Sequence, residues 1–142
     1  MRSWAEGALA LVILLGLGVA LFMFSGESLG EGSTATTAPI IVDPDAAVRG
    51  EIIASRTGCL ACHTIDGTPG SGPTWRGLAG SSRPLQSGDV VTADDVYLTN
   101  SIVDPGSQVV AGFDNIMSPD YEDSLTEQEV VDLVEYIKSL AS

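Results

Sequence analysis

Two cysteines and one histidine stand together in the segment Cys59-Leu60-Ala61-Cys62-His63. Two thiols three positions apart, followed at once by an imidazole, form the pattern that attaches haem covalently. Each thiol can add to one haem vinyl group, and His63 then reaches the iron as the proximal ligand. The alternative is a thioredoxin-like redox pair that precedes a histidine by coincidence. Because the chain has only these two cysteines and one histidine, the pattern favours haem attachment and leaves too few ligands for zinc.

A second axial ligand to such an iron cannot be histidine, because the chain has no other. Met117 is the only methionine in the part of the chain that contains the cysteines, and it precedes the last predicted helix. Lys138, the single lysine, lies inside that helix and is a weaker candidate, and Met117 could instead fill a gap in the core. We expect His63 and Met117 to ligate the iron, a saturated arrangement that favours electron transfer over substrate binding.

Short elements are expected to position these residues. Asp43 as a cap and Pro44 at the first helical position predict a helix that continues to about Thr57. Its apolar face is expected to consist of Ala47, Val48, Ile52 and Ala54. The segment 66–80 is rich in Gly and Pro and is expected to be an irregular loop. The segment 85–91 predicts a small hairpin around a Ser-Gly pair.

Two further helices are expected after the hairpin. Residues 92–95 resemble a capping box and predict a helix from Ala93 to about Val103, with a buried face of Val96, Tyr97 and Ile102. A complete capping box at 126–129 predicts a last helix to about Leu140, with an inward face of Val130, Leu133, Val134 and Ile137. Three short helices make a thin core, so a buried haem is expected to be structural as well as functional.

The N-terminal part of the chain has a different composition. Residues 7–24 carry no charge and form an apolar run of 18 residues, long enough for a single transmembrane helix. Arg2 precedes this run and no basic residue follows it until Arg49, so the positive-inside tendency places the N-terminus in the cytoplasm. The alternative is a cleaved signal peptide, although the run is long for a signal core and a small-residue cleavage site is poor.

These observations predict three parts: a membrane anchor over residues 1–25, a flexible linker over 26–42 and a haem domain over 43–142. The anchor is expected to contact the lipid bilayer through residues 4–24. The haem domain is expected on the periplasmic or extracellular side of the cytoplasmic membrane, because covalent haem attachment is normally completed outside the cytoplasm.

The charge of the chain limits its partners. The formal net charge is −13, and from Asp43 onward five basic side chains stand against sixteen acidic ones. Repulsion by phosphate excludes nucleic acid as a partner. The same charge favours a redox partner with a basic docking surface.

From about Asp43 to Ala141 the chain resembles the class I c-type cytochromes. It is similar in particular to the cytochrome c domain of haem-copper oxidase subunit II and to the monohaem cytochrome c subunit of alternative complex III. The motif Cys59-Leu60-Ala61-Cys62-His63-Thr64 carries most of the resemblance, and Gly72-Pro73-Thr74-Trp75-Arg76-Gly77-Leu78 is similar to the family's Gly-Pro-x-Leu-x-Gly-Leu segment. The closing helix from Leu125 to Leu140 resembles that of the family.

The resemblance implies an all-α class I cytochrome c fold wrapped round one covalent haem c. It further implies that the Pro73 carbonyl accepts a hydrogen bond from His63, and that Gly50 lies at a helix crossing near Leu133 and Tyr136. Two residues depart from the family pattern: Trp75 stands where Leu is usual and makes the haem pocket wall bulkier, and Ser118 separates Met117 from Pro119. Tyr97 is also expected in the haem pocket.

The expected function is that of a membrane-anchored monohaem cytochrome c that transfers single electrons, and not that of an enzyme. We expect it to belong to a quinol-oxidising or terminal-oxidase complex of a respiratory or photosynthetic chain, with other subunits or redox proteins as donor and acceptor. The alternatives are a free-standing tethered electron carrier, a haem enzyme with an open iron site, and a subunit whose haem mainly holds the fold.

Overall fold

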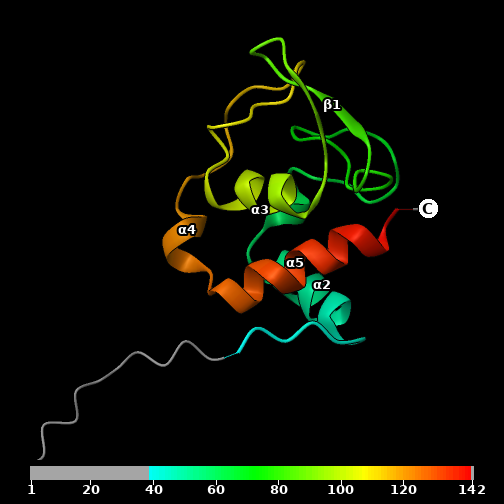
Figure 1. The fold of residues 1–142 in the computed structure, drawn as a ribbon, viewed down its shortest axis with the longest axis vertical. Helices are drawn as coiled ribbons and strands as arrows, with labels where there is room; N and C mark the ends of the chain where they lie inside the picture. The colour runs from blue at the N-terminus through cyan, green and yellow to red at the C-terminus, as the bar shows by residue number, and fades with distance from the viewer. Residues whose placement is uncertain (1–38, 142) are drawn as a thin grey trace, which may run out of the picture. The chain divides into compact units, whose positions relative to one another are not determined.

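The computed structural model describes residues 39–141, which form five helical segments and one hairpin (Figure 1). The elements are α2 (Ala46–Arg56), η1 (Cys59–Ala61), β1 (Ser82–Pro84), β2 (Val90–Thr92), α3 (Asp95–Val103), α4 (Tyr121–Ser124) and α5 (Glu127–Ser139). The predicted anchor over residues 1–25 and most of the predicted linker lie outside this range. In the range that is described, no helix is long and apolar enough to cross a membrane.

Helices α2 and α5 pack against each other and form one end of the domain (Figure 1). The capping box predicted for α5 is present: the Thr126 side chain accepts a hydrogen bond from the Glu129 amide, and the Glu129 carboxylate accepts one from the Thr126 amide. The inward face predicted for this helix is confirmed, because Val130, Leu133, Val134 and Ile137 are all buried. Leu98 of α3 and Leu133 of α5 are the largest fully buried side chains of the core.

The face predicted for α2 is confirmed at Ala54 but wrong for its larger residues. Val48 and Ile52 are 56% and 61% exposed, and the residues that α2 buries are Ala46, Gly50, Ile53 and Ala54. The reason is close approach of the two helices: a Cβ atom at Gly50 would overlap the Asp132 carbonyl and lie 2.7 Å from the Tyr136 Cβ. Small residues allow the backbones to meet at this point, so helix packing takes precedence over the larger apolar stripe. The implied crossing at Gly50 and Tyr136 is therefore present, with Asp132 in the place expected for Leu133.

A polar network joins α2 and α5 beside this crossing. Arg49 donates from Nε and Nη2 to the two carboxylate oxygens of Asp132, both at 2.8 Å, and also pairs with Asp43. Asp132 is only 2% exposed, and the hydrogen bonds from Arg49 hold the pKa of its carboxyl below the ordinary value, although burial opposes this. The Gln128 side chain bonds to Asp132 and to both backbone groups of Ile41. The last residues of the predicted linker are thus attached to α5.

The predicted hairpin is present and begins earlier than expected. Strands β1 and β2 pair antiparallel with Arg83 opposite Val91, and Gly88 takes a φ of +94° in the connecting turn. The expected all-α class is therefore corrected to a mostly helical fold with a small two-stranded sheet. The hairpin is short, with three residue pairs in register.

Helix α3 starts two residues later than predicted. Its N-cap is Asp94, whose side chain accepts a hydrogen bond from the Tyr97 amide. Tyr97 and Ile102 are buried as expected, whereas Val96 is 68% exposed and Leu98 takes its place in the core. The short helix α4 after the long loop was not predicted from the sequence.

Candidate functional site

The Cys-x-x-Cys-His motif forms a tight turn directly after α2. Gly58 takes a left-handed conformation with φ of +79°, which ends the helix and begins the 3-10 turn η1. The Cys62 and His63 amides both donate to the Cys59 carbonyl, at 3.2 and 3.0 Å. The turn thus brings two free thiols, one half-buried and one exposed, next to the imidazole.

The orientation of His63 is set by the Pro73 carbonyl. His63 Nδ1 lies 2.8 Å from this oxygen, and since a carbonyl only accepts hydrogen bonds, Nδ1 must carry the hydrogen. The other ring nitrogen, Nε2, then keeps its lone pair for a metal. Burial lowers the pKa of His63 below its ordinary value, and the hydrogen bond to Pro73 offsets only part of this effect. The ring is therefore neutral near pH 7 and suited to ligation.

Two further neighbours hold the imidazole in place. A Cβ atom at Gly72 would lie 2.7 Å from His63 Cε1 and 2.9 Å from Nδ1, so only glycine fits against the ring. Trp75 stacks on His63 with ring centroids 5.2 Å apart and planes 23° apart, and it makes an edge contact of 6.0 Å with Tyr136. Trp75 is 5% exposed and is not among the residues that line the cavity described next. The Trp75 side chain, which was expected in the wall of the haem pocket, therefore supports the imidazole instead.

A cavity of about 300 Å³ lies over this turn. Six residues predicted from the sequence line it together: Cys59, Cys62, His63, Pro73, Tyr97 and Met117. They come from the motif turn, the Gly-Pro segment, α3 and the long loop before α4. Met117, which is 54 positions from His63 in sequence, is thus brought to the same cavity.

Several lining residues were not predicted. Ser101 Oγ and Gln108 Oε1 are buried atoms on the cavity lining that have no hydrogen-bond partner among the described residues. Ser101 follows Tyr97 by four positions, so helical spacing places both on one face, and this signal was available in the sequence. The others lie in or just after the loop between α3 and α4, where no periodicity indicates which side chains point inward: Gln108, Phe113 and Tyr121.

These residues fit a covalently attached haem. The lining offers a mainly apolar surface with two thiols, one oriented imidazole and one thioether, which is the donor set that such a group requires. The unpartnered polar atoms of Ser101 and Gln108 fit the two carboxylates that haem carries, because a hydroxyl and a rotated amide can both donate hydrogen bonds. In this arrangement the Cys59 and Cys62 thiols would anchor the group, and His63 and Met117 would supply its axial ligands.

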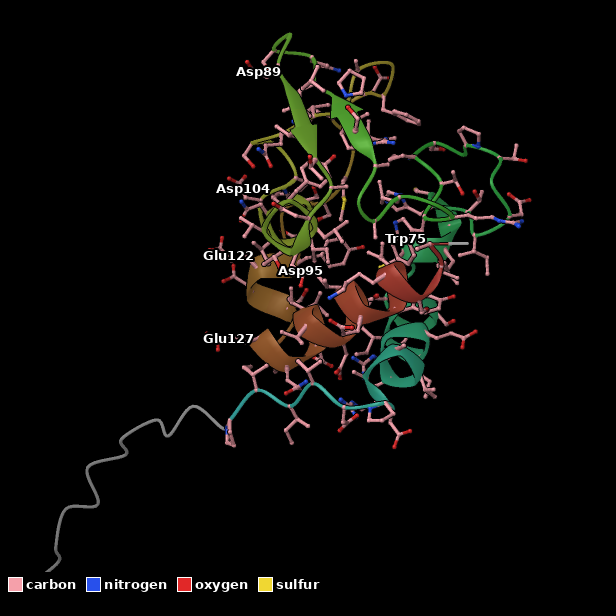
Figure 2. All side chains as sticks on the ribbon, turned by 45° about the vertical axis from the view of Figure 1, so that its right-hand side comes forward. Trp75, Asp89, Asp95, Asp104, Glu122 and Glu127 are labelled. Atoms are coloured by element: carbon pink, nitrogen blue, oxygen red, sulfur yellow. The ribbon has the colours of Figure 1, made fainter. Side chains whose placement is uncertain are left out.

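One edge of the domain is strongly acidic. Figure 2 shows the carboxylates of Asp89, Asp104, Glu122 and Glu127 along one edge of the domain. Three of the five basic residues from Asp43 onward are paired with carboxylates, namely Arg49, Arg56 and Lys138. Little positive charge is therefore left to offset the acidic groups.

A family model matches most of the described part of the chain. No curated protein matches the chain. Among solved structures, cytochrome cH from Methylobacterium extorquens is similar at 25% sequence identity and a TM-score of 0.43, over 66% of this chain and 97% of that chain. The family model described as cytochrome c matches residues 47–141, a range that includes the motif turn, the Gly-Pro segment and Met117. The chain therefore belongs to the cytochrome c family.

Proposed function

We propose that this protein transfers single electrons through one haem c, which Cys59 and Cys62 attach and which His63 and Met117 ligate. Members of the cytochrome c family bind haem covalently and act as electron carriers. The number of haems and the axial ligands are our proposal, supported by the composition of the chain: it offers one attachment motif, one histidine and one methionine on the cavity lining.

The hydrogen bond between His63 and Pro73 is the observation that carries this proposal. It gives the imidazole one tautomer and one orientation before any ligand is present, and it raises the basicity of the ring as a ligand. A histidine beside a thioredoxin-like pair does not have to be oriented, whereas His63 is oriented by this carbonyl, by the Gly72 contact and by the stacked Trp75. When bound, haem supplies an iron that gains and loses one electron at a time.

The residues around the cavity then have distinct tasks. Cys59 and Cys62 would keep the group attached, and His63 and Met117 would both hold its iron, which would leave no open position for a substrate. Tyr97, a buried residue of α3, would form part of the wall around the group. As a neutral sulfur ligand, Met117 would favour the reduced iron and raise the reduction potential.

Haem attachment and ligation are tested on the purified, haem-loaded protein. Haem should stay with the denatured chain through acid extraction into organic solvent, and the double variant of Cys59→Ser and Cys62→Ser should release it. The oxidised wild type should show the weak near-infrared band of sulfur-to-iron ligation, and Met117→Ala should lose this band and lower the reduction potential. Freely extracted haem would overturn the attachment, and a potential unchanged in Met117→Ala would overturn the axial role.

We further propose that the protein is anchored in the cytoplasmic membrane, N-terminus inside, with the haem domain on the outer face. The support is the uncharged run of 18 residues at 7–24 and the basic Arg2 before it. We place it as a subunit of a quinol-oxidising or terminal-oxidase complex, in line with its resemblance to the cytochrome domains of such complexes. A free-standing tethered carrier is the alternative.

Purification in mild detergent separates these two placements. A complex subunit should co-purify with other redox subunits, and its reduction by quinol should persist at high salt. N-terminal sequencing of the mature chain tests the anchor, because a chain that starts near residue 21 or 26 would show that a signal peptide was removed. A protein that purifies alone and is neither reduced nor oxidised on a catalytic timescale would defeat the relay role.

A further inference from the structure

The loop that carries Met117 has little structure of its own. Between the end of α3 and the start of α4, residues 104–120 contain turns and a single isolated β-bridge, with no helix or strand. Half of the residues that line the cavity come from this loop, from Pro105 to Ser118. A loop without regular structure opens easily unless other parts of the protein hold it.

The hairpin provides that support. Leu85 bridges Val110, the Gln86 amide donates to the Val109 carbonyl at 2.8 Å, and the Ala111 amide donates to the Pro84 carbonyl at 2.8 Å. Figure 1 shows the loop after α3 running up to the hairpin at the end of the domain opposite α2 and α5. Leu85 is itself buried in the core, so the hairpin residues that contact the loop are held in place by core packing.

A side chain extends the same contact towards Met117. Gln86 donates from Nε2 to the Phe113 carbonyl at 2.6 Å, four residues before the methionine. Phe113 lines the cavity, and its amide donates to the Val110 carbonyl, which closes a turn within the loop. The Gln86 backbone and side chain together therefore fix the loop at two points, Val109 and Phe113, while Met117 lies just beyond the second.

We propose that Gln86 is a positioning residue that holds the Met117 loop closed over the cavity, a role that rests on the proposed ligation by Met117. Its hydrogen bond exists only while the loop is in place, so it lowers the fraction of molecules in which the methionine has left. One such bond changes an opening equilibrium about fivefold, because its net value is about 1 kcal/mol. The hairpin is thus part of the site although none of its residues lines the cavity.

Gln128 supplies a matched control. Its Nε2 also donates to a backbone carbonyl, that of Ile41, at 2.7 Å. It stands at the start of α5 and does not line the cavity. Replacing either glutamine by alanine removes the same side chain and a hydrogen bond to a backbone carbonyl, but only Gln86 touches the loop. Gln128→Ala also removes the bonds to Asp132 and to the Ile41 amide, so it is the more disruptive of the two changes.

Imidazole titration of the oxidised, haem-loaded protein tests this role. Imidazole binds the position that Met117 leaves, so its apparent affinity reports how often the loop opens. Gln86→Ala should bind imidazole about fivefold more tightly than wild type, while Gln128→Ala should match wild type. Gln86→Glu should show at least the same gain, because it keeps the shape but faces the Phe113 carbonyl with an acceptor. Thermal unfolding of all three variants shows whether a general loss of stability explains any gain.

The outcomes separate this inference from the proposed function. A wild type without the near-infrared sulfur band would overturn the Met117 ligation and the positioning role together. A wild type with the band, but with equal imidazole affinity in Gln86→Ala and Gln128→Ala, would overturn the positioning role alone. A gain in Gln86→Ala that Gln128→Ala does not share would support it.

Discussion

The imidazole of His63 is held from three directions by a short stretch of loop. Pro73 fixes its tautomer, Trp75 stacks on one side and the Gly72 backbone lies against it. A metal ligand fixed in this way loses little freedom on binding, which strengthens ligation. The Gly-Pro-Thr-Trp sequence is thus explained residue by residue, since each member except Thr74 contacts the ring.

Gly72→Ala should displace the imidazole, because the added methyl group would lie 2.7 Å from Cε1. We expect a loss of about 1–3 kcal/mol in the free energy of unfolding and a shifted reduction potential in the haem-loaded protein. Gly106→Ala is the control, since its nearest neighbour is a flexible side-chain atom at 3.5 Å. Urea unfolding and a redox titration of both variants give the comparison, and equal behaviour would show that the ring has room to move.

At the scale of elements, sequence patterns predicted the last helix better than the first. The capping box of α5 is local, and its apolar residues all face inward because that side of the helix is the only broad apolar stripe. Helix α2 has two stripes, and the pattern favoured the larger side chains Val48 and Ile52. The structure buries the small-residue stripe instead, because a crossing at Gly50 depends on a partner backbone that local sequence does not contain.

The candidate site shows the same difference between local sequence signals, which are predictable, and long-range contacts, which are not. The attachment motif and the Gly-Pro segment are local and were predicted, and Met117 was predicted because the composition offers only one weaker rival, Lys138. Ser101 was missed although it shares a helix face with Tyr97. The support of the loop by Gln86 could not be predicted from the sequence, because a single side chain joins residues that are 27 positions apart.

Gly50→Ala tests the crossing directly. The new methyl group would overlap the Asp132 carbonyl, so α2 and α5 must separate, and we expect a loss of at least about 2 kcal/mol in the free energy of unfolding. Val48→Ala on the exposed face of α2 should change this free energy by less than about 0.5 kcal/mol. Denaturant unfolding of both variants measures these two changes in free energy. A large effect of Val48→Ala would mean that this face is covered in the native protein.

The ion pair beside the crossing predicts a pH dependence. Arg49 depresses the pKa of Asp132 in the folded state, so the pair stabilises the fold above the unfolded pKa of about 4 and this contribution is lost as the pH falls through the lower folded value. Asp132→Asn should therefore cost about 2 kcal/mol at pH 7, and the cost should shrink as the pH falls through the lowered pKa of Asp132. Unfolding across an acidic pH series checks this, with Asp123→Asn as an exposed control on α4. A cost independent of pH would assign the effect to packing.

At the scale of the whole molecule, we expect the net negative charge near the cavity to guide the approach of a partner. Asp104 and Asp114 belong to the loop that lines the cavity, and both are exposed. Glu51 is equally exposed but lies on α2, away from the cavity lining. A basic partner that takes electrons from this site should therefore feel the first two carboxylates more than the third.

Electron exchange with a soluble basic redox protein should slow as salt rises. Raising the ionic strength from about 0.01 M to about 0.1 M shortens the Debye length from about 30 Å to about 10 Å, which screens attraction between opposite charges. Asp104→Asn and Asp114→Asn should each lower the second-order rate constant at low salt by a few-fold, whereas Glu51→Gln should lower it less. Stopped-flow mixing across a salt series measures all of these rates. If the three variants lose rate equally, only total charge matters and docking is not directed to the cavity; if rates rise with salt, the basic-partner proposal is wrong.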